Sequence, residues 1–160
     1  MDLFRKHYFT GACTMSIIDD LLGGITGFAT GIWPEPEQKL RLVDGKLRPC
    51  PGTPNCVSSE SARAGEHVEP LSFKGSPEKA WELLKQIVAA MGGKVGNEET
   101  GYLWATFVVP VFGFTDDVEF RIDAAAGVIH VRSSSRLGYS DLGVNRARVE
   151  HLRSEFNRRS

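Results

Sequence analysis

Near its C-terminus the chain reads Val131-Arg-Ser-Ser-Ser-Arg-Leu-Gly-Tyr-Ser-Asp-Leu-Gly-Val-Asn-Arg-Ala-Arg148. This stretch leaves a β-type segment, turns at Gly138 and enters a helix. It carries serines, a tyrosine, an aspartate, an asparagine and four arginines. Core packing rarely requires so many polar groups close together. The stretch therefore indicates either a polar network that fastens a strand to a helix or a binding site.

The elements around this stretch predict an α+β domain. Ser76-Pro77-Glu78 is typical of a helix start, and an apolar stripe at helical spacing continues to Met91. Residues 68–73 are a candidate for a short strand before the first helix. Three strands are expected after it, over residues 102–109, 116–123 and 128–135, with residues 94–97 as a candidate for a fourth, short one. Their short connections favour antiparallel hairpins. We expect an antiparallel sheet of three to four strands with two helices on one face, formed by residues 49–160. An irregular, loosely structured N-terminal arm over residues 1–48 precedes it.

The composition is typical of one soluble domain, with 160 residues, 41% hydrophobic and 24% charged. A net charge of −1 argues against a nucleic-acid binder, because such proteins carry a strong basic excess. Phosphate loops, dinucleotide fingerprints, nucleophile elbows and zinc-protease helices are all missing from the sequence. The four histidines lie in separate segments. We therefore expect no metal and no cofactor, and we hold an enzyme only as an alternative.

The last hairpin has a register that follows from its loop. If residues 124–127 form a four-residue loop, Asp123 faces Val128 and Glu119 faces Arg132. Val118 and Phe120 then point toward the helices, while charged side chains occupy the opposite face. This charged face is typical of a solvated ladder of ion pairs. Alternatively, its arginines bind an anion, because guanidinium suits carboxylate and phosphate.

The final helix is expected over residues 141–158, with Ser140 or Asp141 as its cap. Asn145 falls on its inward stripe together with Leu142, and a buried asparagine needs hydrogen-bond partners. The simplest account is that Asn145 ties the helix to the serine strand and to the Gly138-Tyr139 turn. The alternative is an anion pocket at the helix N-terminus, which the charge of Asp141 disfavours. The candidate ligand-binding residues are Arg132, Ser134, Arg136, Tyr139, Asn145, Arg146 and Arg148.

Cys50 and Cys56 bracket a short Pro/Gly turn, and a loop over residues 50–66 is expected around them. Their spacing leaves three readings open, which are a disulfide, two inert thiols, and a metal or redox role. A disulfide requires an oxidising compartment. The N-terminal residues only weakly resemble an export signal. This favours the cytoplasm, or a periplasmic or lumenal compartment if the N-terminus is processed.

Three motifs together resemble the family known as domain of unknown function 1499. They are Cys50-Pro-Gly-Thr-Pro-Asn-Cys-Val-Ser-Ser59, Asp116-Asp-Val-Glu119 and Arg132-Ser-Ser-Ser-Arg-Leu-Gly-Tyr-Ser-Asp-Leu-Gly-Val-Asn-Arg146. The resemblance covers roughly residues 49–156. It implies an α+β domain without an assigned activity, cofactor or catalytic residue. Similar proteins are often exported, membrane-tethered or lumenal, which favours a Cys50–Cys56 bridge.

Three functional hypotheses follow from the sequence. The leading one is a non-enzymatic module that binds a protein partner or a small anionic ligand through the stretch from Arg132 to Arg148. The second is a hydrolase- or transferase-like enzyme that uses Asp116 or Asp117 with Tyr139. The third is a structural or peripherally membrane-associated protein that uses the N-terminal arm and an apolar tip at Phe112.

Overall fold

The computed structural model describes residues 40–109 and 113–160. The chain divides into two units, residues 1–34 and 35–160, and all described residues belong to the second. The elements of this unit are β1 (Cys56–Ser58), β2 (Leu71–Ser72), α2 (Pro77–Ala90), β3 (Lys94–Glu99), β4 (Tyr102–Val109), β5 (Phe114–Asp123), β6 (Val128–Ser135) and α3 (Val144–Arg159). The expected α+β class is confirmed.

The described strands form one six-stranded antiparallel sheet rather than the expected three or four. Its order is β1-β6-β5-β4-β3, and β2 pairs with β6 beside β1. β1 lies inside the segment expected to be a loop. Three residues carry no periodic signal of their own, and β1 exists because it pairs with β6, Cys56 lying opposite Ser134. The predicted hairpin register is confirmed, with Asp123 opposite Val128 and Glu119 opposite Arg132.

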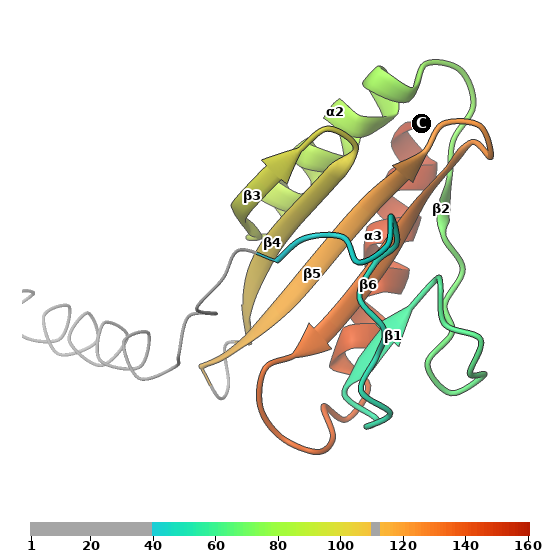
Figure 1. Ribbon diagram of the computed structural model, residues 1–160. Coiled ribbons are helices and arrows are strands. Elements are labelled where there is room, and N and C mark those ends of the chain that lie inside the picture. The colour runs from blue at the N-terminus through green and yellow to red at the C-terminus, as the bar shows by residue number, and fades with distance from the viewer. Residues whose placement is uncertain (1–39, 110–112) are drawn as a thin grey trace, which may run out of the picture. The chain divides into compact units, whose positions relative to one another are not determined.

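Both helices cover one face of the sheet (Figure 1). Helix α2 begins as its sequence predicts, because the Ser76 hydroxyl accepts a hydrogen bond from the Lys79 N–H and Pro77 occupies the first turn. Apolar side chains of α2 and α3 pack against Val118, Phe120 and Val131 of the sheet. Burial of such side chains supplies most of the favourable free energy of folding.

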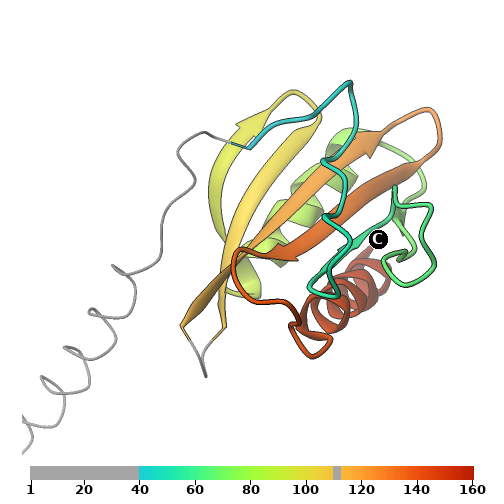
Figure 2. The same cartoon turned by 60° about the horizontal axis from the view of Figure 1, so that its bottom comes forward.

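The opposite face of the sheet is also covered. Residues 40–50, the covering segment, cross in front of β4, β5 and β6 (Figures 1 and 2). Leu40 and Leu47 pack on Tyr102 and Trp104 and are buried with them. Residues 40–48, assigned to the arm on sequence grounds, therefore pack on the domain. The charged ladder beneath is not solvated as expected, and Glu119 has no exposed surface.

A disulfide joins Cys50, at the end of the covering segment, to Cys56 at the start of β1. It closes a short loop that connects the layer over the sheet to an edge strand of the sheet. The pairing that the family resemblance favoured is the one found.

Helix α3 begins at Val144, one turn later than the cap expected at Ser140 or Asp141. Gly143 occupies the cap position with φ of 85°, and Leu142 before it has φ of 54°. Leu142 was expected on the inward stripe of the helix. It is instead 90% exposed, because the chain is still in a turn at this residue.

Candidate functional site

Asn145 is the centre of a polar network between α3 and β6. Its side-chain oxygen accepts hydrogen bonds from the Ser133 hydroxyl at 2.5 Å and the Arg148 guanidinium at 2.9 Å. Its amide nitrogen lies 2.9 Å from the Ser135 hydroxyl and 2.7 Å from a carboxylate oxygen of Asp141. Asn145 has no exposed surface, so these contacts replace water that it would otherwise bind.

The network extends to the loop before β1. The main-chain oxygen of Asn55 lies 3.1 Å from the Asn145 amide nitrogen, and the Asn55 amide donates to the Gly138 carbonyl at 2.6 Å. Arg148 donates to Asp116 at 2.7 Å and lies over the Phe107 ring, 5.1 Å from its centroid. The predicted tie between the helix, the serine strand and the Gly138 turn is therefore present. Sequence reasoning assigned no role to Asn55 or Phe107.

On the outer face, two of the candidate arginines pair with carboxylates of β5. Arg132 donates to Glu119 at 2.8 Å, and Glu119 also accepts from Arg48 and from the Tyr102 hydroxyl. Burial beside Glu119 raises the pKa of Tyr102 well above its ordinary value, which keeps this hydroxyl a donor.

Arg136 donates to Asp117 through Nε and Nη2, and the Trp104 indole N–H donates to the same carboxylate at 2.9 Å. An anionic ligand at these arginines would have to displace buried carboxylates.

The two other candidates near the network also contact the protein itself. Arg146 donates to the carbonyls of His67 and Gly65 at 2.8 and 2.9 Å, which ties α3 to the loop before β2. Ser134 is buried and its hydroxyl lies 3.4 Å from the Ser135 carbonyl. Of the seven candidates, Tyr139 alone is largely exposed, at 75%.

The exposed turn (residues 137–144) presents several large apolar side chains to solvent. Leu137, Tyr139, Leu142 and Val144 are large hydrophobic residues exposed along it, and Val108 is exposed at the adjacent end of β4. Figures 1 and 2 show this turn at the same end of the molecule as the ends of β4 and β5. Exposed large apolar residues that gather at one end of a domain are typical of interaction sites. The predicted apolar tip at Phe112 lies outside the described residues.

The exposed turn borders a cavity of about 230 Å³, the turn pocket. Asp116 and Asp141 are among the residues that line it. One carboxylate oxygen of Asp116, Oδ1, is buried and has no hydrogen-bond partner among the described residues. Such a group calls for an explanation, because an unmade hydrogen bond at a buried acceptor costs about 1–3 kcal/mol. The apolar part of the wall consists of Val109, Phe114, Leu137, Leu142 and Val144.

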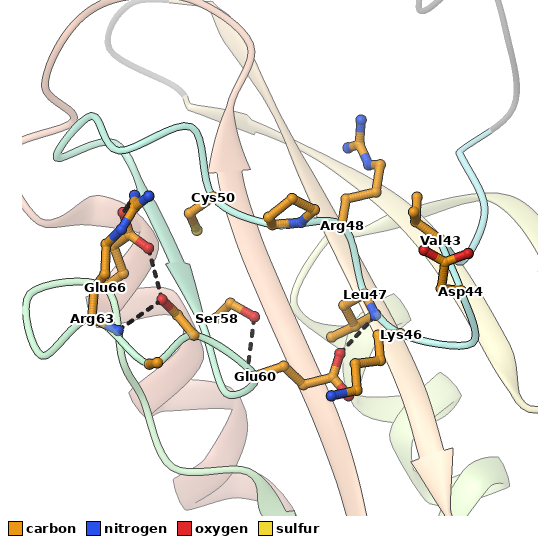
Figure 3. Close-up of a pocket in the computed structure, with 13 residues that line it drawn as sticks. Val43, Asp44, Lys46, Leu47, Arg48, Cys50, Ser58, Glu60, Arg63 and Glu66 are labelled. Carbon is orange, nitrogen blue, oxygen red and sulfur yellow. Dashed lines mark hydrogen bonds and ion pairs between the residues drawn. The ribbon is translucent and has the colours of Figure 1, made fainter.

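A larger cavity of about 440 Å³ lies between the covering segment and the loop after β1 (Figure 3). Two of the carboxylates that line it, those of Glu60 and Glu66, already have partners. Glu60 accepts from the Leu47 N–H at 2.6 Å and from Arg121, and Glu66 accepts from Ser61 and Arg63. Burial raises the pKa of Glu66, but the hydrogen bonds from Ser61 and Arg63 outweigh it and leave the pKa lowered. This cavity therefore shows less sign of a missing ligand than the turn pocket does.

The residues proposed for catalysis do not meet. Asp116 and Asp117 point to opposite faces of the sheet, where they pair with Arg148 and Arg136 respectively. The turn pocket is lined by Asp116 but by neither Asp117 nor Tyr139. His130 pairs with the Ser59 hydroxyl at 3.1 Å, a contact that sequence reasoning did not anticipate. Ser59 also accepts the Val131 N–H, so this pair fastens the loop after β1 to β6.

Within residues 40–109 and 113–160, no cluster of histidine, cysteine and carboxylate side chains has the geometry of a metal site. Over the same residues, no helix is long and apolar enough to cross a membrane.

Residues 46–156 match the family described as Protein of unknown function (DUF1499). The chain belongs to this family. No curated protein matches the sequence. The DUF1499 region contains the disulfide, the polar network and the exposed turn, so the candidate site lies wholly within the family domain.

One sequence signal could have shown that Leu142 lies in the exposed turn rather than on the buried face of the helix. Asp141-Leu-Gly143 places a turn-forming aspartate and a glycine on either side of Leu142. This pattern favours a turn that ends before the helix, and a turn would expose the leucine. The helical spacing of Leu142 to Val149 concealed it.

Proposed function

We propose that this DUF1499 protein is a non-enzymatic binding module whose exposed turn and turn pocket bind a protein partner. The sequence-based hypothesis placed the binding surface at the stretch from Arg132 to Arg148. The proposal restricts this surface to residues 137–144. The polar network and the arginine–carboxylate pairs then support this surface rather than contact the partner. A small anionic ligand is the less favoured occupant, because the arginines are already paired with carboxylates.

The observation that carries the proposal is Leu142. This side chain is 90% exposed, and its φ of 54° lies in a region that favours glycine and asparagine. Holding a leucine in left-handed backbone costs about 1–2 kcal/mol, and its exposure recovers no burial energy. Strained backbone of this kind clusters at binding and switch regions. A partner that covers Leu142 accounts for both properties.

The test is a photo-crosslinking amino acid placed at Tyr139 in the protein produced in its native cells. We expect a defined protein adduct that disappears when Leu142→Asn is added. Asparagine tolerates this backbone, so Leu142→Asn should melt at the wild-type temperature or higher, gaining up to about 1 kcal/mol. Loss of the adduct with a retained fold separates binding from stability.

Val43→Asn is the matched control, since Val43 is an exposed hydrophobic residue on the covering segment. It should leave the adduct unchanged. An adduct that survives Leu142→Asn, or one no stronger than that formed from a crosslinker at exposed Val95, would overturn the proposal.

A further inference from the structure

We infer that the turn pocket receives a primary ammonium group at the end of an apolar stem. This inference rests on the proposed function and deepens it, because it states which chemical group a binding partner places in the pocket. A lysine side chain and a free alkylamine share this chemistry.

The unpartnered oxygen of Asp116 requires a hydrogen-bond donor. Asp116 is 1% exposed, and its Oδ2 accepts from Arg148 at 2.7 Å while Oδ1 has no partner among the described residues. Asp116 lines the turn pocket, but Oδ1 has almost no accessible surface, so a donor in the pocket reaches it only after a small shift of the Asp116 side chain or its neighbours. An N–H donor with positive charge makes the stronger hydrogen bond to a carboxylate.

The charge of the wall also favours a cation. Asp141 lies on the same wall and accepts hydrogen bonds from the Gly143 N–H at 2.9 Å and from Asn145, which are neutral donors. Among the described residues, those that line the pocket include two aspartates and no lysine or arginine. Arg148 neutralises one of these carboxylates from the side of α3, so the charge facing the pocket is negative. A carboxylate or phosphate ligand is disfavoured by the same charges.

The rest of the wall suits a short hydrocarbon stem. It consists of valine, leucine and phenylalanine side chains around about 230 Å³ of space. Removal of each methylene from water strengthens binding by about fourfold when the wall is apolar. A stem of a few methylenes ending in an ammonium therefore matches both parts of the pocket.

The experiment is a titration of the full-length protein, followed by amide NMR shifts of Ser135, Asp116 and Val144. The probes are n-butylammonium, n-hexylammonium, hexan-1-ol and hexanoate. We expect saturable shifts with both amines, about fifteenfold tighter binding for the six-carbon amine because it has two more methylenes, and binding at least tenfold weaker for the alcohol and the acid. Equal binding of hexanoate, or no saturable shift with either amine, would overturn the inference.

Two variants test the location of binding. Asp116→Asn removes the charge but also weakens the pair with Arg148, so loss of fold could obscure its result. Val144→Phe fills the mouth of the pocket and leaves that pair intact. Each should weaken hexylammonium binding at least tenfold, whereas Val95→Phe on β3 should not change it. Unchanged binding in Val144→Phe would contradict the inference.

Two further measurements are needed. One distinguishes a lysine of a partner protein from a free amine, and the other distinguishes failure of the ammonium inference from failure of the proposed function. Nα-acetyl-lysine N-methylamide that binds as tightly as n-butylammonium points to a lysine of a partner protein, and much weaker binding points to a free amine. If no amine binds but the Tyr139 crosslink still depends on Leu142, the ligand chemistry is wrong and the proposed function stands. If amines bind but the Tyr139 crosslink is missing, the ligand chemistry stands and the proposed binding of a protein partner is wrong.

Discussion

The stretch from Val131 to Arg148 divides into a buried half, made of its strand end and its helix end, and an exposed half, the turn between them. The side chains of the two halves make different contacts. The strand and helix ends of the stretch bury serines, arginines and an asparagine in contacts with the protein itself. The turn between them exposes leucine, tyrosine and valine side chains to solvent. In this chain, a high density of polar residues therefore marks structural support. The apolar residues set among them form the surface that we propose for binding.

The largest expected effect comes from the centre of the buried half. Asn145→Ala removes partners from the Ser133 hydroxyl, the Arg148 guanidinium and the Asp141 carboxylate, and it leaves the Ser133 hydroxyl buried. We expect a loss of about 3 kcal/mol in the free energy of unfolding, because each unsatisfied buried group is costly. Denaturant unfolding followed by circular dichroism measures it.

Asn157→Ala is the control for this variant, because Asn157 is exposed on the same helix. It should change stability by less than about 0.5 kcal/mol. If Asn145→Ala is as stable as this control, the buried half is not a structural support and the comparison fails.

Much of this buried half could be predicted. Period-two alternation in the strands and the short loop at residues 124–127 determine the register of β5 and β6, and helical spacing places Asn145 on the inward face. The ion pair of Glu119 with Arg132 follows from that register.

Other features depend on contacts between distant residues. Leu40 and Leu47 pack on Tyr102 and Trp104, far along the chain, and no local period announces such contacts. β1 is too short to carry a pattern of its own. Leu142 was misplaced because its spacing to Val149 is helical, although Gly143 interrupts the helix. The sequence pattern thus located the polar network more reliably than the surface it supports.

An intermediate loss of stability is expected on replacing Arg136. This variant tests whether Arg136 belongs to the buried half of the stretch or to a binding surface. The sequence-based binding hypothesis predicts that replacing both Arg136 and Arg146 by alanine abolishes binding and leaves the melting temperature nearly unchanged. The structure instead gives Arg136 a pair with Asp117, and both side chains are about 10% exposed. Removing the guanidinium leaves Asp117 buried with the Trp104 indole as its remaining strong donor. We expect a loss of about 2 kcal/mol, measured by chemical unfolding.

Arg158→Ala is the matched control, because Arg158 is mostly exposed and pairs with Glu155 on the surface of α3. Surface pairs contribute little, so its effect should stay below about 0.5 kcal/mol. A stable Arg136→Ala variant would return Arg136 to the list of binding residues and would weaken the division between the two halves.

The smallest effect concerns His130, which lies on β6 just before the stretch and extends the comparison to that end of the strand. Burial lowers the pKa of His130, although the carboxylates of Glu60 and Asp123 partly oppose this. The unfolded chain therefore takes up the proton first, near the ordinary value of 6.5. The stabilising contribution of neutral His130 is complete above that pH, and it is lost as the pH falls toward the lowered pKa of the folded state. His130→Gln, which does not titrate, should flatten the decline of stability in this interval, and His151→Gln at an exposed position of α3 should not. Equal slopes for the wild type and His130→Gln would show that the contact of His130 with Ser59, unlike those around Asn145, makes no measurable contribution to the fold.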